Sequence, residues 1–213
     1  MRYWIVFEIL FLVLVFSYGC EENIVSYDSN DDIYTYLPLN IGNYWIYDWS
    51  YKLDSILTKK VYKQEIKNKL IHQDGSLIYG YTINQVGIIP NPNQPMLGYY
   101  CAKNYAIYYY SDTKDTVMPG TSVLCHKIPL IKSPLTIGES WIVSNDTFKI
   151  VSFPSVEVNG INYKKTVLVL TKRDNFIDST WFVKDIGIVK ISSFGLSSRT
   201  EWNEWNLKSY SKN

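Results

Sequence analysis

Hydrophobic and polar residues alternate over much of the chain, and this period of two constrains the fold more than any other feature. Successive side chains of a strand point to opposite faces of a sheet, so the alternation predicts half-buried strands. Tyr79, Tyr81 and Ile83 share one face of a candidate strand, and residues 167–170 are apolar on both faces. Aromatic residues make up 16% of the chain, which also favours strands.

Short turn sequences separate these apolar segments. Asn159-Gly160 and Asp74-Gly75 each stand between two of them, and both pairs suit a type I′ hairpin turn, which needs positive φ at both central positions. No segment after residue 20 has a convincing helical period. We therefore predict a mainly β domain with about ten strands, built as an antiparallel curved sheet, half-barrel or sandwich.

One nine-residue pattern, P-L-x-I-G-x-x-W-I, occurs twice. Residues 38–46 and 134–142 are identical at six of nine positions and lie 96 residues apart. Proline fixes φ, glycine permits a tight bend, and tryptophan anchors the start of the next strand in the core. We interpret the pattern as a turn that leads into a strand, and we predict two similar halves, 33–130 and 131–213. The key positions are Gly42, Trp45, Gly138 and Trp141.

The amino terminus has the composition of a secretory signal. Arg2 supplies a positive charge, an apolar run follows, and Gly19 is the small residue expected before a cleavage point. The run is shorter than the roughly twenty residues that a spanning helix needs. We predict a helical signal peptide over residues 1–19.

Cys20 follows Gly19 directly, and the segment resembles the lipobox of bacterial lipoproteins, although Ser17 and Tyr18 depart from the preferred residues. The resemblance implies a diacylglyceryl group on the Cys20 thiol. The alternatives are an uncleaved anchor helix, or a plain secretory signal with an incidental cysteine. Residues 20–32 are acidic and polar, so we expect a flexible tether between the membrane and the single domain 33–213.

The later motifs resemble those of a group of uncharacterised bacterial lipoproteins of the Bacteroidota type. The motifs are the first P-L-x-I-G-x-x-W segment, within residues 34–47, and a strand, turn, strand segment over residues 181–190 with Gly187 in its turn. The resemblance implies a curved antiparallel sheet or sandwich on a lipid anchor, and no catalytic residues. Glu21-Glu22 also resembles an acidic export signal of surface lipoproteins. The expected location is the cell envelope, at the outer membrane, on either side.

Two further cysteines remain if Cys20 carries lipid. An oxidising compartment allows Cys101 and Cys125 to form a disulfide bond. The alternative is two buried free thiols.

Few residues are suited to chemistry. The formal net charge is +1 with no basic stripe, so we expect no nucleic-acid partner. His72, His126 and the cysteines match no zinc spacing, so we predict no metal. Glu201 and Glu204 cannot share a glycosidase site, because in a strand they point to opposite faces. We expect no catalytic residues and no cofactor.

Three functions remain open. The first is a non-enzymatic lipoprotein, anchored in the membrane, that binds an apolar ligand, a glycan or a protein partner through the sheet. The second is a structural or assembly subunit of an envelope complex. The third, an extracytoplasmic hydrolase, is the least favoured. A binding protein should show a contiguous apolar or aromatic concavity, and a structural subunit a flat patch or open edge strand. An enzyme should show titratable groups that converge in a cleft.

Overall fold

The structure is a computed structural model, and it describes residues 32–71, 77–88, 98–110, 128–143, 145–196 and 201–213. This part of the chain holds one short 3₁₀ helix and fourteen strands, where the sequence predicted about ten. The difference comes from short strands that hydrophobic periodicity cannot separate. In chain order the elements are η1 (Ile33–Tyr36), β1 (Tyr44–Leu53), β2 (Ile56–Ile71), β3 (Leu77–Gln85), β4 (Gly98–Lys103), β5 (Ala106–Tyr110), β6 (Ile128–Lys132), β7 (Ser140–Val143), β8 (Asp146–Ser152), β9 (Val156–Val158), β10 (Ile161–Tyr163), β11 (Val167–Lys172), β12 (Phe176–Val183), β13 (Gly187–Gly195) and β14 (Glu201–Ser211).

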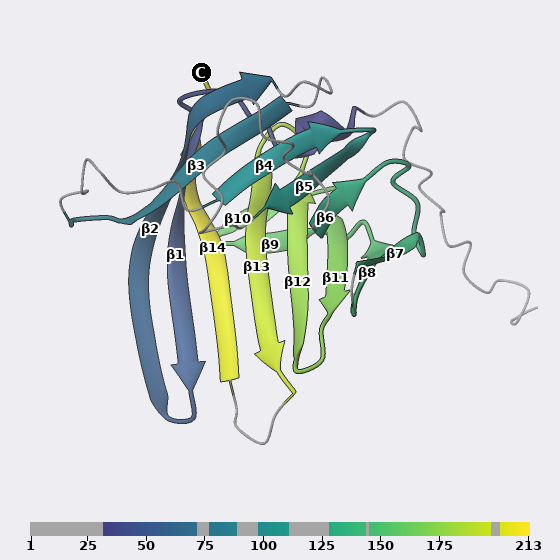
Figure 1. Ribbon diagram of the computed structural model, residues 1–213. Helices are drawn as coiled ribbons and strands as arrows, with labels where there is room; N and C mark the ends of the chain where they lie inside the picture. Colours follow the sequence, from purple (N-terminus) through teal and green to yellow (C-terminus); the bar gives the residue numbers. More distant parts are fainter. Residues whose placement is uncertain (1–31, 72–76, 89–97, 111–127, 144, 197–200) are drawn as a thin grey trace, which may run out of the picture.

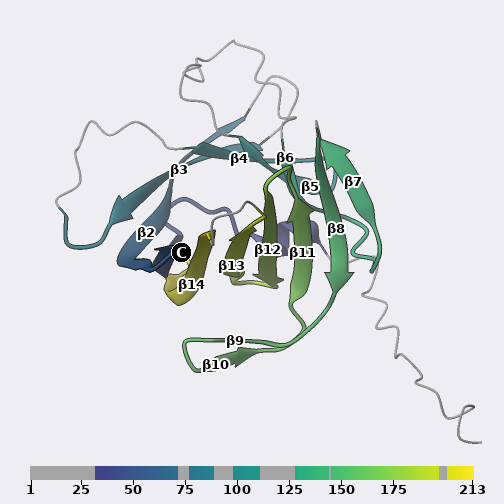
Figure 2. The same cartoon turned by 90° about the horizontal axis from the view of Figure 1, so that it is seen from below.

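Twelve of these strands form one antiparallel sheet in the order β6-β5-β4-β3-β2-β1-β14-β13-β12-β11-β8-β7. The sheet curves strongly, so that β3 to β6 lie across the interior from β11 to β14 (Figure 2). The mainly β, antiparallel half-barrel expected from the sequence is therefore confirmed. The first and last strands of the sequence are central, since β1 pairs with β14 along its whole length.

The first copy of the repeated pattern forms a tight turn that leads into β1. Gly42 has a φ of +87°, a backbone conformation that side-chain-bearing residues rarely adopt. Its N–H donates to the oxygen of Ile66 at 2.9 Å, and the Asn43 N–H donates to Asn40 at 3.1 Å. The Ile66 N–H returns to the oxygen of Asn43 at 3.0 Å. The turn therefore joins the start of β1 to the middle of β2.

The second copy forms the same turn before β7. Gly138 has a φ of +90°, and its N–H donates to the oxygen of Ile150 at 2.8 Å. The Glu139 N–H donates to Thr136, and the Ile150 N–H donates back to Glu139. Each hydrogen bond has its counterpart in the first copy, as expected of a turn that leads into a strand. The division into halves at 130/131 falls inside β6, which pairs with β5.

The tryptophan of each copy is buried and hydrogen-bonded. The indole of Trp45 donates to the oxygen of Ile186 at 2.6 Å, and that of Trp141 to the oxygen of Pro129 at 3.0 Å. Trp45 also lies against Gly187, where an added Cβ would come within 3.1 Å of the indole nitrogen. The β12–β13 turn, with Gly187 at a φ of +107°, therefore packs against Trp45 of the first copy of the repeated pattern.

The half-barrel is closed at one end by η1, which lies at the top in Figure 1. Its own residues Ile33 and Tyr36 are fully buried. The Asp185 N–H donates to the oxygen of Thr35 at 2.8 Å, and the Tyr105 N–H donates to the Tyr34 hydroxyl at 3.3 Å. These contacts connect the β12–β13 turn to the β4–β5 turn, and we call this the closed end.

The opposite end carries the tips of the β1–β2 and β11–β12 hairpins (Figure 1), and we call it the open end. The β9–β10 hairpin lies outside the wall of β11 to β14 (Figure 2). Its turn has positive φ at Asn159 and Gly160, as the sequence predicted, whereas Asp74-Gly75 lies outside the described residues. None of the described residues belongs to a helix with the length and hydrophobicity needed to cross a bilayer.

Candidate functional site

A cavity of about 620 Å³ occupies the concave side of the sheet. Its volume is within the range of about 300–1,000 Å³ that is usual for small-molecule sites. Every strand of the large sheet except β7 contributes at least one residue to the cavity wall. The cavity is therefore a product of the curvature of the whole sheet, and it extends from the deep interior to the open end.

Stacked tyrosines form one deep wall. Tyr81, Tyr100 and Tyr109 come from the adjacent strands β3, β4 and β5. The ring centroids of Tyr81 and Tyr100 are 4.8 Å apart, and Tyr109 lies 6.4 and 6.3 Å from them. Ring contacts of this kind contribute beyond simple area burial. They also hold three flat apolar faces in fixed positions beside the cavity.

A second aromatic group lies on β1, β2 and β14, and its members Tyr47 and Trp205 line the cavity. Trp49 on β1 pairs directly with Trp205 on β14, with ring centroids 6.2 Å apart. Tyr62 from β2 packs on both, at 5.8 Å from Trp49 and 5.3 Å from Trp205. Tyr47 contacts the edge of Trp205 at 6.0 Å. The two aromatic groups, with Ile83, Ile188 and Ile191, make the interior largely apolar.

The polar atoms of these deep tyrosines are used within the protein. The Tyr47 hydroxyl donates to the oxygen of Ile188 at 3.0 Å, and the Gln64 amide donates to the Tyr100 hydroxyl at 2.7 Å. Tyr81 and Tyr109 share a hydrogen bond. Burial raises the pKa of Tyr47, Tyr81 and Tyr100 above the ordinary value, so all three stay neutral. The deep wall thus offers mainly ring faces, because each of these hydroxyls already has a hydrogen-bond partner inside the protein.

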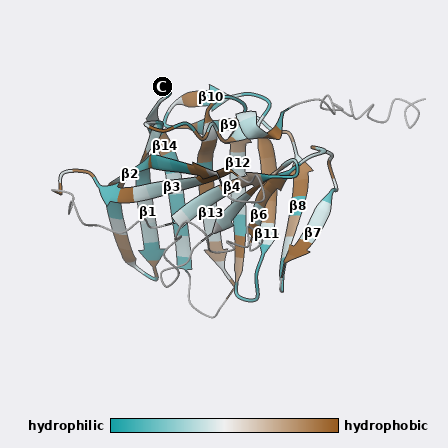
Figure 3. Ribbon diagram, turned by 45° about the horizontal axis from the view of Figure 1, so that its top comes forward, coloured by the Kyte–Doolittle hydropathy of each residue, from teal (hydrophilic) through white to brown (hydrophobic). Residues whose placement is uncertain are grey.

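Toward the open end the wall becomes polar, in one register row across five strands. The backbone pairs run from β1 through β14, β13 and β12 to β11. We call these residues the mouth row: Tyr51, Asn203, Ser193, Asp178 and Thr171. One residue pair deeper, the same strands carry the inner row: Trp49, Trp205, Ile191, Thr180 and Val169. The change in polarity along β11 is visible in Figure 3.

Side chains around the mouth row are tied together. The Trp49 indole donates to Asn203 Oδ1 at 2.6 Å, and the Tyr51 hydroxyl donates to Glu201 at 3.2 Å. Arg173 forms an ion pair with Asp178 at 3.1 Å. The Asp178 side chain is only 13% exposed, whereas that of Arg173 is 49% exposed. The open end is therefore polar, and several of its polar side chains are hydrogen-bonded or ion-paired to one another.

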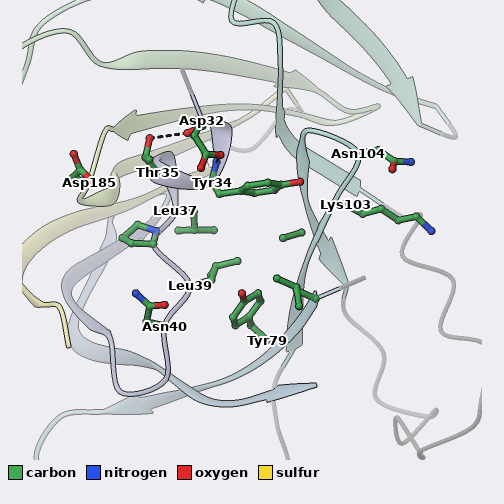
Figure 4. Close-up of a pocket in the computed structure, with 13 residues that line it drawn as sticks. Asp32, Tyr34, Thr35, Leu37, Leu39, Asn40, Tyr79, Lys103, Asn104 and Asp185 are labelled. Carbon is green, nitrogen blue, oxygen red and sulfur yellow. Dashed lines mark hydrogen bonds between the residues drawn. The ribbon is translucent and has the colours of Figure 1, made fainter. Parts of the chain in front are cut away.

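A second hollow of about 540 Å³ lies at the closed end. Figure 4 shows Tyr34 and Tyr79 on opposite sides of it with Leu39 between them, and Lys103 extends away. Its walls come mainly from the segment around η1 and from the β4–β5 turn. The interior cavity is larger and is framed by paired strands, so we take it as the candidate site.

The motif positions predicted from the sequence lie outside the interior cavity. Gly42, Trp45, Gly138, Trp141 and Gly187 shape turns and core, and none lines the interior cavity. Glu201 lines the cavity, while Glu204 pairs with Lys190 on the other face, as predicted. The sequence missed the mouth row, because its five members come from five strands and only the register brings them together.

Of the cysteines and histidines in the chain, only Cys101 lies among the residues that the structure describes. Cys101 is buried and forms a disulfide bond. Cys125 lies outside the described residues, so the pairing of these two stays a prediction. Cys20, His72 and His126 also lie outside them. Within the described ranges no three metal-ligating side chains come together.

Comparisons with known proteins give only loose likenesses. No protein-family model matches the chain, and no curated protein matches it in sequence. A protein from Bacteroides fragilis described as exported, with a YmcC-like fold, has a TM-score of 0.41 at 9% identity, over 81% of this chain and 97% of that one. A protein from Parabacteroides distasonis described as a lipoprotein has a TM-score of 0.34 at 9% identity, over 83% and 98%. A LolA superfamily protein from Nitrosomonas europaea has a TM-score of 0.31 at 8% identity, over 85% and 90%. Scores of this size assign no function to this chain.

Proposed function

We propose that this chain is a lipoprotein of the cell envelope that binds an apolar ligand inside its half-barrel, without catalysing a reaction. The observation that carries the proposal is the cavity of about 620 Å³ with two aromatic walls. A contiguous concavity of this kind is what distinguishes a binding protein from a structural subunit, which needs only a flat patch or an edge strand.

The chemistry of the deep wall favours an apolar ligand over a glycan. Sugars need many hydrogen-bond partners, and a buried polar group without a partner costs about 1–3 kcal/mol. The Tyr47 hydroxyl donates to the oxygen of Ile188, and the Tyr100 hydroxyl accepts a hydrogen bond from the Gln64 amide. Ring faces and isoleucine side chains remain as the contact surface. Apolar contact of this kind contributes about 25 cal/mol per Å² buried.

The site also lacks the character of a catalytic centre. Among the described lining residues, the charged groups are Arg173, Asp178 and Glu201, and all three lie at the open end. Neither histidine nor cysteine is among them. The lipid anchor on Cys20 and the outer-membrane location belong to the same proposal, and they rest on the lipobox-like amino terminus.

The test is to identify the molecules that co-purify with the protein, and to compare them with those bound by a variant whose cavity is blocked by a larger side chain. The native lipoprotein would be extracted with a membrane-solubilising polymer in place of detergent, and native mass spectrometry would identify bound molecules. Ile191→Trp fills the inner row and should lower the occupancy at least tenfold. The matched control is Ile142→Trp on β7, where the side chain is 71% exposed. Equal occupancy in both variants, or a stoichiometric protein partner with an empty cavity, would refute the proposal.

A further inference from the structure

Along β1, β14, β13, β12 and β11 the side chains on the cavity face change from mainly apolar to polar between the inner row and the mouth row. Beyond the mouth row, Phe176 on β12 is again an apolar lining residue. The mouth row and the inner row are separated by two residues on each strand, or about 7 Å. Four of the five inner-row residues are apolar, with Thr180 as the exception, and all five mouth-row residues are polar. A purely apolar ligand would gain no binding free energy from the mouth row, because the polar side chains beside the ligand would lose their water without gaining hydrogen-bond partners.

From this juxtaposition we propose that the ligand is an amphiphile with an uncharged, hydroxyl-bearing head. Its chain lies among the deep tyrosines and isoleucines, and its head hydrogen-bonds to the mouth row at the open end. The inference rests on the proposed function and names the class of ligand for the same site.

The mouth row can both donate and accept hydrogen bonds. The Trp49 indole occupies Asn203 Oδ1, which leaves the amide NH₂ of Asn203 to donate elsewhere. Ser193 and Thr171 carry hydroxyls that do either. Asp178 accepts, although its carboxylate is already paired with Arg173. A head with hydroxyl groups matches this mixture, since each hydroxyl is both a donor and an acceptor.

The charges around the mouth row argue against an anionic head. The described lining contains the carboxylates of Asp178 and Glu201 and one guanidinium, Arg173. Arg173 is engaged by Asp178 at 3.1 Å and approached by Asp146 at 3.7 Å. A phosphate or a fatty-acid carboxylate would therefore meet an excess of negative charge. An uncharged head avoids that repulsion.

The experiment compares three ligands with the same acyl chain. Full-length protein in phosphatidylcholine nanodiscs would be loaded with the fluorescent apolar probe N-phenylnaphthylamine, with empty nanodiscs as the blank. Displacement would be measured with monomyristoylglycerol, methyl myristate and myristate. Monomyristoylglycerol should bind about tenfold more tightly than the other two, as expected for one or two additional net hydrogen bonds.

Two serines on one strand provide the matched variants. Ser193 lies in the mouth row, while Ser192 points to the other face of β13 and pairs with Glu204. Ser193→Ala should lower the preference for monomyristoylglycerol over methyl myristate at least threefold, and Ser192→Ala should leave it unchanged. Equal affinities for these two ligands, tighter binding of myristate, or no effect of Ser193→Ala would overturn the amphiphile inference.

The same assay separates the two proposals. If Ile191→Trp abolishes displacement by all three ligands while Ser193→Ala changes nothing, the apolar cavity stands and only the head-group inference fails. If Ile191→Trp has no effect on methyl myristate, or if no ligand binds the unmodified protein, the proposed function fails and the inference fails with it.

Discussion

The indole nitrogen of Trp141 in β7 donates a 3.0 Å hydrogen bond to the main-chain oxygen of Pro129 in β6. These strands are the two ends of the sheet order, so this bond spans the seam of the half-barrel. An ion pair between Lys132 and Glu139 at 2.9 Å crosses the same seam, and the Lys132 ammonium lies 5.3 Å from the Trp141 ring centroid. Side chains thus hold together two edges that no ladder of backbone hydrogen bonds joins in the described sheet.

Replacing Trp141 with phenylalanine should therefore weaken the seam. The lost hydrogen bond contributes about 1 kcal/mol, and the smaller ring leaves a packing defect beside Phe148, whose ring stacks on Trp141 at 5.6 Å. We expect the free energy of unfolding in urea to fall by about 1–3 kcal/mol. Trp202→Phe, on the outer face, is the control and should cost less. An equal loss in both variants would contradict a special role for the seam.

Gly187→Ala should destabilise more than Gly138→Ala. Both glycines have positive φ, which costs a residue with a Cβ about 1–2 kcal/mol. An added Cβ at Gly138 meets nothing within 4 Å, whereas at Gly187 it comes within 3.1 Å of the Trp45 indole nitrogen and 3.3 Å of Leu37. Overpacking adds about 1–3 kcal/mol at Gly187. Thermal and urea unfolding of the two variants measure the difference, and equal losses would mean that Trp45 moves aside freely.

Reduction of the disulfide bond should lower stability by about 3 kcal/mol if Cys101 pairs with Cys125. Peptide mapping under non-reducing conditions should recover the two cysteines in one linked peptide, and Cys125→Ser should give a free Cys101 thiol that reacts with maleimide after unfolding. A linked peptide that contains Cys20 in place of Cys125 would refute both this pairing and lipidation at Cys20.

Stability should fall at alkaline pH because of the buried tyrosines. Burial raises the folded-state pKa of Tyr47 and Tyr100 above the unfolded value of about 10. A raised pKa gives stability that is fully present below about pH 10 and is lost as the pH rises above it, because only the unfolded chain then releases these protons. The free energy of unfolding should therefore decline above about pH 10, with a smaller slope in Tyr47→Phe. Phenolate absorbance that reaches its full value before unfolding would contradict the burial.

Cys20→Ala should release the protein from membranes. Two or more acyl chains hold a protein stably on a bilayer, whereas one chain holds it weakly. Fractionation should therefore move the variant from the membrane pellet to the soluble fraction, while Cys125→Ala stays in the pellet. Retention of the Cys20→Ala variant would favour an uncleaved anchor helix instead.

Local features of this fold could be predicted from the sequence because they depend on neighbouring residues. The positive φ values at Asn159 and Gly160 follow from the residue types, and the opposite faces of Glu201 and Glu204 follow from strand geometry. Because successive side chains of a strand point to opposite faces, only one of Tyr99 and Tyr100 can face inward. The sequence could not say which, because that depends on how β4 is aligned with β3.

The site itself could not be predicted, because it depends on register between strands that are distant in the chain. Tyr51 and Asn203 are direct partners on β1 and β14 although 152 positions separate them. Neither stands in a recognisable motif. A polar residue in an alternating strand is indistinguishable from any solvent-exposed one until the curvature of the sheet turns its face inward.

The position of η1 decides which way an anchored molecule faces. Twelve positions separate Cys20 from Asp32, and if they form the flexible tether that the sequence predicts, they would span about 20 Å. The ten residues of β1 cover roughly 33 Å. If the lipid proposed for Cys20 anchors the protein, the molecule is held by its closed end, and the open end would face away from the membrane. Under the proposed function, the ligand would then reach the open end from the aqueous side rather than from the membrane beneath.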